Sequence, residues 1–482
     1  MTQGGLIIPE YYNLKNASSV LVNSNAYRKQ INSLFASFSL GWKSLLFVDG
    51  TVRNDWSSTL PIGRNSFIYP SLTTSLILSE LNGVKDIGWL DFAKVRLGWA
   101  QVGNDTDPYQ LQRAYEASQS FDGLASYKLP NQLNNQNLKP EITSSWETGL
   151  SIQAFKNRVG LDVTYYDNVS RNQIINIPVS SAFGYDSKVI NAGKINNKGV
   201  EVTLTATPVR SNGLEWNSSL NWSRNRNKVI QLAPGVNTFQ LANSLVTLVA
   251  REGQPYGQIL GNDFIYAADG QKVIKADGTY DRGQQLTPLG SVLPKYLFGF
   301  QNSLTYKNFN LGFLVDGRVG GKFFSQTYKV GMYAGVLDKT AANNVRETGV
   351  ILDGVKGTVT YRADGTYEVT GTSPNDTRIT AQAWARGEYS GPTPQTIFDA
   401  TFVKLREITF GYNLPLANKI VKQIYFGLYG RNLANIYTAS KYIDPEFTSE
   451  GLTNPPSDNS SVCSEIIPEY RKLLSWSIIL RR

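Results

Sequence analysis

The side chains of this chain that could take part in chemistry are carboxylates, hydroxyls, lysines and aromatic rings. The sequence has no histidine and a single cysteine, Cys463, which excludes imidazole-based triads, histidine-containing metal sites and an intramolecular disulfide. Glu147 and Glu201 could form a general acid–base pair. Each alternates with apolar residues along an extended segment, which favours a solvated position on the polar face of a strand. We therefore expect no catalytic residue and no enzyme.

Acidic and glycine-rich loop segments are the other candidate sites. The run from Asn104 to Asp107, and Asp263, supply the hard oxygen atoms that Ca²⁺ prefers. They lack the spacing of an EF-hand, so roles in turns and caps are the favoured interpretation. Four glycines could suggest a phosphate-binding loop, namely Gly257, Gly261, Gly320 and Gly321. No Lys-Ser or Lys-Thr follows them in register, so we expect no metal site and no cofactor.

Four aromatic side chains lie in one predicted loop, where they could stack on sugar rings. They are Tyr109, Tyr115, Phe121 and Tyr127. Aromatic rings also pack loops together, and the sequence does not decide between these two roles. The substrate-binding residues are therefore unknown at this stage.

The composition favours strands and turns over helices. Aromatic residues make up 12% of the 482 residues and there are 42 glycines; aromatic residues are enriched in strands and glycine in turns. The net charge of +9 could indicate a nucleic-acid partner, but Lys and Arg are dispersed along the chain. We expect a solvated basic surface and no nucleic acid.

Apolar and polar residues alternate with a period of two along much of the chain, as in strands with one apolar face. The clearest segments are 93–99, 159–165, 200–207 and 214–223. Many segments run to about ten residues, the length that a tilted strand needs to cross a bilayer. Strands of soluble proteins average about five to six residues, so the length favours a membrane barrel over a soluble sandwich.

Short and long connections alternate between the predicted strands. Short turns join 32–41 with 44–54, 143–155 with 158–168, 199–208 with 214–225, 294–306 with 309–318, and 399–411 with 422–432; 68–79 and 90–101 have a longer link. Long polar segments separate the pairs at 102–142, 169–198, 226–293, 319–398 and 433–469. With a last strand near 470–480, about thirteen strands are predicted. Outer-membrane barrels place short turns in the periplasm and long loops outside, so we expect a periplasmic C-terminus.

The beginning of the chain carries no signal for export. Met1 to Gly5 has neither a basic nor an apolar region of a signal peptide, and no apolar run reaches the roughly 18 residues of a membrane helix. These features alone would suggest a soluble cytoplasmic protein. The strand pattern contradicts that interpretation.

A series of short motifs follows the strand pattern in order. They are Arg53-Asn54-Asp55-Trp56-Ser57-Ser58, Gly98-Trp99-Ala100-Gln101-Val102-Gly103-Asn104, Leu138-Lys139-Pro140-Glu141-Ile142-Thr143 with Trp146-Glu147 and Gly149, Asn191, Gly193 and Ile195 with Asn197-Lys198-Gly199-Val200-Glu201, Gly253-Gln254-Pro255-Tyr256-Gly257, Pro294-Lys295-Tyr296-Leu297-Phe298-Gly299-Phe300 with Asp316-Gly317 and Gly320-Gly321, Phe402-Val403-Lys404-Leu405-Arg406-Glu407-Ile408 with Gly411-Tyr412 and Pro415, Arg431-Asn432-Leu433, and Asp444-Pro445-Glu446. In this order they resemble the C-terminal barrel portion of SusC/RagA-type TonB-dependent outer-membrane transporters, which are nutrient importers of the Bacteroidota.

The resemblance implies a barrel of about 22 strands around an N-terminal plug. It also implies a TonB box that engages the TonB–ExbB–ExbD complex, and a SusD-like surface lipoprotein as a lid. Residues 1–482 would be the C-terminal part of such a receptor barrel, without signal peptide, TonB box, plug and about nine strands, and 1–30 would be an extracellular loop. The expected fold class is therefore all-β: a partial antiparallel up-and-down transmembrane β-barrel with long extracellular loops and short periplasmic turns.

The C-terminus departs from the family pattern, because members end in an aromatic residue and this chain ends in Leu480-Arg481-Arg482. Pro468 and Arg471 keep a trace of the family's last motif, while 459–482 otherwise fits poorly. This departure puts insertion by the barrel-assembly machinery in doubt, and a shifted reading frame could explain it.

The expected function is import of nutrients, oligosaccharides or peptides, across the outer membrane. This chain would supply the barrel wall, the lumen surface and the loops, in contact with outer-membrane lipid. Two alternatives stay open: a soluble all-β carbohydrate-binding or adhesive module, and a passive porin.

Overall fold

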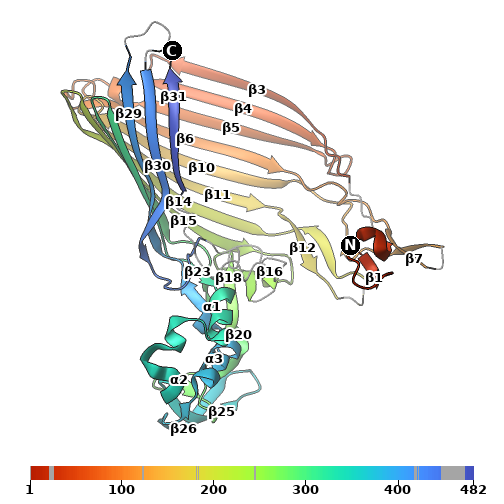
Figure 1. Cartoon of the computed structure of the whole chain (residues 1–482). Coiled ribbons are helices and arrows are strands. Elements are labelled where there is room, and N and C mark those ends of the chain that lie inside the picture. The colour runs from red at the N-terminus through yellow and green to blue at the C-terminus, as the bar shows by residue number, and fades with distance from the viewer. Residues whose placement is uncertain are drawn as a thin grey trace.

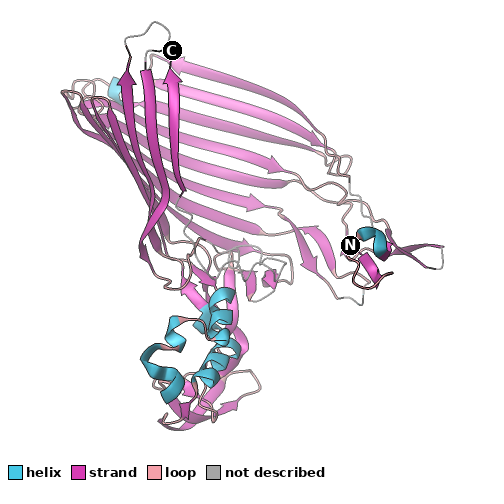
Figure 2. Ribbon diagram, viewed as in Figure 1, coloured by secondary structure: helices cyan, strands magenta, loops and turns pink. Residues whose placement is uncertain are grey.

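The structure is a computed structural model of the 482-residue chain, and most of it is β-sheet (Figures 1 and 2). It describes residues 2–20, 26–121, 124–180, 182, 184–243, 246–416, 421, 423–446 and 473–481. Among these residues, no helix is long and apolar enough to cross a membrane. Pro468, Arg471 and Cys463, which were singled out in the sequence, lie outside the described residues.

One antiparallel sheet of thirteen strands forms the wall of the molecule, with its strands in sequence order. The strands are β3 (Ile31–Trp42), β4 (Leu46–Ser57), β5 (Ser66–Ile77), β6 (Leu90–Asn104), β10 (Glu141–Ala154), β11 (Val159–Arg171), β14 (Lys194–Ser211), β15 (Leu214–Gln231), β21 (Tyr296–Tyr306), β22 (Phe309–Val319), β29 (Phe402–Pro415), β30 (Gln423–Thr438) and β31 (Leu473–Arg481). The predicted fold class and all thirteen strands are confirmed, with boundaries that differ by a few residues.

Short turns and long connections lie at opposite ends of the sheet, as the sequence predicted (Figure 1). The turn between β14 and β15 holds Asn212 at φ 47° and Gly213 at φ 77°, and the turn between β21 and β22 holds Lys307 at φ 53°. Positive φ at these positions matches the twist of paired strands. The sheet curves strongly, and its C-terminal end lies at the end of the short turns (Figure 1).

The two faces of the sheet differ in chemistry. Trp146 on β10 lies opposite Trp99 on β6, with ring centroids 6.2 Å apart, and Trp146 is 63% exposed. The same face carries exposed apolar side chains on the other strands, among them Leu204, Leu220, Phe300, Leu311, Phe410 and Leu428. Arg96 and Asp162 lie on the opposite face. An apolar band this broad, left uncovered by protein, is what a barrel presents to lipid.

The long connections fold into structure of their own, which the sequence pattern did not predict. They hold β1 (Thr2–Leu6), β2 (Ala17–Val20), β7 (Glu116–Phe121), β8 (Leu124–Lys128), β9 (Gln132–Leu133), β12 (Ile174–Pro178), β13 (Ser187–Asn191), β16 (Thr238–Asn243), β17 (Thr247–Arg251), β18 (Gln258–Phe264), β19 (Val273–Ile274), β20 (Arg282–Ser291), β23 (Lys322–Phe324), α1 (Gln326–Ala334), α2 (Val345–Thr348), β24 (Val350–Ile351), β25 (Val355–Tyr361), β26 (Tyr367–Pro374), β27 (Arg378–Ile379), α3 (Ala381–Ser390) and β28 (Ile397–Asp399). Ser325 and Thr380 cap α1 and α3, with Oγ and Oγ1 accepting from Tyr328 N and Ala383 N.

Two of these connections, 232–295 and 320–401, build one outer subdomain (Figure 1). Most of the largest fully buried side chains of the described residues lie here, including Phe323, Phe324, Ile259, Ile265 and Met332. Many large apolar side chains of the wall strands, by contrast, are exposed, although Phe67, Val229 and Phe402 are buried. The water-excluding core is therefore in the outer subdomain, while the wall relies on its surroundings to cover its apolar face.

Candidate functional site

A cross-strand ion pair braces the polar face of the wall. Arg96 on β6 reaches across β10 to Asp162 on β11, with Nη2–Oδ1 at 2.7 Å and Nη1–Oδ2 at 2.9 Å. Gly149 lies under the guanidinium, since a Cβ there would stand 2.3 Å from Arg96 Nε. Ser151 Oγ donates to the same carboxylate. This bidentate pair fixes the register of three strands and leaves a charged, hydrogen-bonding surface on the lumen side.

The two carboxylates considered for acid–base catalysis are not brought together. Glu147 on β10 faces Tyr166 on β11, which in turn faces Gly199 on β14, two residues from Glu201. One whole strand therefore separates the two glutamates, a backbone distance of roughly 10 Å. Both side chains are exposed on the polar face. Exposure on the polar face is what the sequence favoured, and a role as solvated lumen residues stays a prediction.

A cluster of charges, here called the outer clasp, joins two distant motifs at the loop end of the wall. Its members are Asp316, Lys404, Arg406, Asp444 and Glu446. Lys404 Nζ lies 2.6 Å from both Asp444 oxygens and 2.6 Å from Glu446 Oε2, and its side chain is only 6% exposed. Arg406 Nε donates to Asp316 Oδ1 at 2.7 Å, and the guanidinium also pairs with Glu446. The clasp thus ties residues 439–446 to β29 and β22.

Opposing effects act on Glu446 within the outer clasp. Burial disfavours its charged form, but hydrogen bonds from Arg406 and Lys404 outweigh burial and hold the pKa of Glu446 below its ordinary value. The carboxylate is therefore ionised at neutral pH. The stability that ionised Glu446 contributes to the clasp is fully present above the pKa of this residue in the unfolded chain. It is lost as the pH falls through the lower pKa of the folded state.

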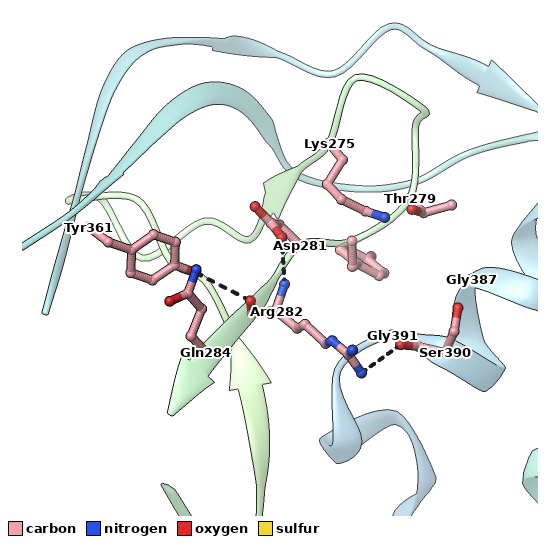
Figure 3. Close-up of a pocket in the computed structure, with 10 residues that line it drawn as sticks. Lys275, Thr279, Asp281, Arg282, Gln284, Tyr361, Gly387, Ser390 and Gly391 are labelled. Carbon is pink, nitrogen blue, oxygen red and sulfur yellow. Dashed lines mark hydrogen bonds between the residues drawn. The ribbon is translucent and has the colours of Figure 1, made fainter. Parts of the chain in front are cut away.

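A polar cavity opens in the outer subdomain (Figure 3). It has a volume of about 430 Å³ and is lined by Lys275, Thr279, Tyr280, Asp281, Arg282, Gln284, Tyr361, Gly387, Ser390 and Gly391. Arg282 Nη1 donates to the Ser390 carbonyl at 2.9 Å, and Asp281 Oδ1 accepts from the Arg282 backbone N–H at 2.9 Å. Two cations, a carboxylate, amides and phenol rings surround the space, a mixture suited to a neutral polar ligand such as a sugar or a peptide.

Close packing of α3 positions this cavity. A Cβ at Gly387 would stand 2.8 Å from Thr279 Cγ2, so glycine lets α3 lie against the 275–281 hairpin. On the other side of α3, Glu388 accepts two hydrogen bonds from Lys339 Nζ, at 2.9 and 3.0 Å, and one from Tyr328 Oη at 3.0 Å. Burial, and then the Glu388 carboxylate, raise the pKa of Tyr328 well above its ordinary value. Tyr328 therefore stays a neutral donor.

Replacing Glu388 by Ala should destabilise the outer subdomain by about 3 kcal/mol, because Lys339 would lose its buried counter-ion and Tyr328 its acceptor. Hydrogen exchange across 326–334 and 381–390 measures the effect. The matched control is Glu368→Ala, whose carboxylate pairs with Arg362 at 2.9 Å but is 58% exposed. Equal protection in the two variants would contradict the structural role given to Glu388.

The acidic loop residues have protein partners. Asp105 accepts hydrogen bonds from Lys29, Ser57 and Thr59, and Asp263 Oδ1 accepts from Phe264 N at 2.7 Å. Within the part of the chain that the structure describes, no three histidine, cysteine, aspartate or glutamate side chains are placed to hold a metal ion. Asp105 bonds to residues 46 to 76 positions away, which is no local turn or cap, while Asp263 bonds to its immediate neighbour. The role of the acidic run in turns and caps stays a prediction.

The glycines and loop aromatics fall in separate places. Gly257 (φ 75°), Gly320 (φ 77°) and Gly321 (φ 87°) provide positive φ at connections, while Gly261 lies inside β18 against Thr393. Tyr109, Tyr115 and Tyr127 are exposed at 55%, 71% and 66%, and Phe121 ends β7. Tyr115 lines a second, smaller cavity of about 170 Å³ with Arg113, Gln132 and Tyr185.

Sequence reasoning missed the cavity of Figure 3. Its lining comes from 275–284, from Tyr361 and from 387–391, and no single stretch has a recognisable spacing. The one local signal was the dense run Thr279-Tyr280-Asp281-Arg282, which has the composition of an ordinary polar turn and gains its role only where α3 packs beside it.

Comparison with known proteins identifies the family to which the chain belongs. Residues 8–386 match the family model described as TonB dependent receptor-like, beta-barrel. The chain is 25% identical over 474 residues to the TonB-dependent receptor P26 of Formosa agariphila, covering 92% of this chain and 45% of the relative. It is 24% identical over 467 residues to the TonB-dependent receptor SusC of Bacteroides thetaiotaomicron, covering 89% and 43%. The chain thus spans less than half the length of these relatives.

A solved structure supports the same fold. The structure of the RagAB peptide transporter superposes with a TM-score of 0.69 at 20% sequence identity, covering 91% of this chain and 48% of that one. The resemblance to SusC/RagA-type receptors, stated from the motifs, is confirmed, and so is the prediction that the chain is no enzyme, because the family consists of transport receptors. This chain belongs to the TonB-dependent receptor-like β-barrel family.

Proposed function

We propose that this chain is the wall and loop portion of a receptor that imports an oligosaccharide or a peptide across the outer membrane, driven by TonB. The observation that carries the proposal is the division of the thirteen-stranded sheet into an apolar outer face and a hydrogen-bonding inner face. A soluble sandwich would bury that apolar face. The C-terminus at the short-turn end would then lie in the periplasm.

The partners follow from the relatives. A relative is named SusC and a structural neighbour is titled as a peptide transporter, so we propose a SusD-like surface lipoprotein over the loop end and the TonB–ExbB–ExbD complex as the energy source. The polar cavity beside Arg282 and Asp281 is the proposed first contact for the substrate. Its mixed lining suits hydroxyl and amide groups, which both substrate classes carry.

The test is uptake of labelled oligosaccharides and of labelled peptides by cells that carry or lack the gene for this protein. Uptake that needs the gene and stops when a protonophore collapses the proton gradient is the expected result. Arg282→Gln should raise the half-saturating concentration about tenfold, since one charge-assisted hydrogen bond is lost. Arg362→Gln, an exposed charge of the same subdomain outside the cavity, is the control.

Other outcomes would favour the alternatives. Gene-dependent uptake that survives the protonophore would indicate a passive porin. No gene-dependent uptake of either substrate class, together with a protein that stays soluble without detergent, would contradict the proposal and support a soluble binding module.

A further inference from the structure

A basic patch lies on the outer face of the wall at its loop end. On β15 the outward-facing positions continue past Trp222 as Arg224, Arg226 and Lys228, and all three side chains are exposed. The register places Lys198 of β14 opposite Arg226. Arg171, at the end of β11, faces the same way as Tyr165 and is exposed. We name Arg171, Lys198, Arg224, Arg226 and Lys228 the rim patch.

The rim patch is on the lipid-facing side and not on the lumen side. Side chains alternate along a strand, so Arg224 and Arg226 share a face with Leu220, which belongs to the exposed apolar band. In the same way Lys198 shares a face with Leu204. The polar lumen residues, such as Glu201, have the opposite parity.

The charges of the rim patch are nearly uncompensated. Lys198 pairs with Asp167, Nζ to Oδ2 at 2.8 Å, and Asp167 is the only carboxylate on the outward face of the described strands β10, β11, β14 and β15. Within the described residues, no ion pair is formed by the other four cations. Four free cations on one face repel one another, and a surface anion would relieve that repulsion.

The height of the patch matches the headgroup layer. Trp222 and Tyr296 pack with ring centroids 6.2 Å apart and end the apolar band on β15 and β21, as interface aromatics do. A tilted strand climbs roughly 2.5 Å per residue, which puts Arg224, Arg226 and Lys228 roughly 5, 10 and 15 Å above Trp222. The polar layer of a leaflet begins where the hydrocarbon ends and is roughly 5–7 Å deep. Arg224 therefore lies within this layer, and the long side chains of Arg226 and Lys228 can extend back toward it.

We propose that the rim patch binds the phosphate groups of a phosphorylated glycolipid in the outer leaflet. Arginine suits this ligand because its guanidinium donates two parallel hydrogen bonds to a phosphate. The inference rests on the outer-membrane placement of the proposed function. It adds a lipid site that takes no part in substrate uptake. It also explains why these cations lie on the lipid-facing side of the wall and not on the lumen side.

The test uses the receptor purified from the outer membrane, stripped of lipid in a non-ionic detergent, with bisphosphorylated lipid A and its dephosphorylated form as the added lipids. Native mass spectrometry counts the bound lipids. The variant R224Q/R226Q/K228Q should bind the phosphorylated lipid about 100-fold more weakly. The control K43Q/K156Q/K307Q removes three exposed charges at the short-turn end and should bind as the parent does.

The result separates this inference from the proposed function. Three results would overturn the site. The rim variant could bind the phosphorylated lipid as the parent does, both variants could lose the same affinity for it, or the parent could bind the dephosphorylated lipid equally well. Substrate uptake should be unchanged in the rim variant. A receptor absent from the outer-membrane fraction would instead contradict the proposed function.

Discussion

Refolded alone into detergent, the 482-residue chain should aggregate and should give no compact band that shifts on heating. The sheet has two edge strands, β3 and β31, and no pairing joins them in the described residues. All twelve residues of β3 are exposed, so its outer edge presents about a dozen backbone N–H and C=O groups without partners. Each costs several kcal/mol in a lipid-like medium. The sum exceeds the roughly 5–15 kcal/mol that stabilises a typical domain.

An exposed edge strand can pair with a strand of another molecule, so we expect the chain to aggregate through intermolecular strand pairing. The variant L34K/F38K puts two charges on β3 and should stay dispersed longer than the parent chain, because charged edge strands resist pairing. A full-length TonB-dependent receptor, refolded in the same detergent, is the positive control. A discrete, heat-modifiable band from the 482-residue chain would show that this edge closes by itself and would refute the expectation.

The wall was predictable from the sequence because one physical rule governs it. Alternation with a period of two decides which side chain faces lipid, so the spacing of Val200, Val202 and Leu204 is enough to mark a strand. Turn residues such as Asn212 and Gly213 then fix the register of neighbouring strands. Both signals are local.

The outer subdomain was not predictable in the same way, because non-local packing holds it together. Ser325 and Thr380 cap α1 and α3, but these helices are only 9 and 10 residues long and lie within polar segments. Glu388 accepts a hydrogen bond from Lys339, 49 residues away in the sequence, and Arg282 donates one to Ser390, 108 residues away. Neither pair has a sequence spacing that a local pattern could reveal. Arg282 and Ser390 line the cavity of Figure 3, and α3 carries both Ser390 and Glu388.

The outer clasp shows how a motif can be recognised without its role being understood. Its two halves, Lys404 with Arg406 and Asp444 with Glu446, were visible as separate motifs about 40 residues apart in the sequence. Only the pairing of β29 with β30 brings the halves together, and it turns two family motifs into one ion-pair network.

Replacing Lys404 by Met should destabilise the loop end of the wall by about 3–5 kcal/mol, since Asp444 would keep a buried charge without its cation. Lys404 is 6% exposed and Asp444 9% exposed, so water cannot replace the lost partner. Glu446 would keep Arg406, and the loss should therefore centre on Asp444. Hydrogen exchange across 439–446 in the purified receptor should rise by about two orders of magnitude or more.

Two further variants distinguish a buried ion pair from a general loss of charge. Lys441→Met removes a cation from the same loop, where Lys441 pairs with Asp338 at 2.8 Å but is 72% exposed, and exchange should be nearly unchanged. K404M/D444L removes both buried charges and should recover much of the protection, because an apolar pair costs no desolvation. If K404M alone left the exchange of 439–446 as slow as in the parent, the clasp would contribute nothing and some other contact would hold the loop to β29.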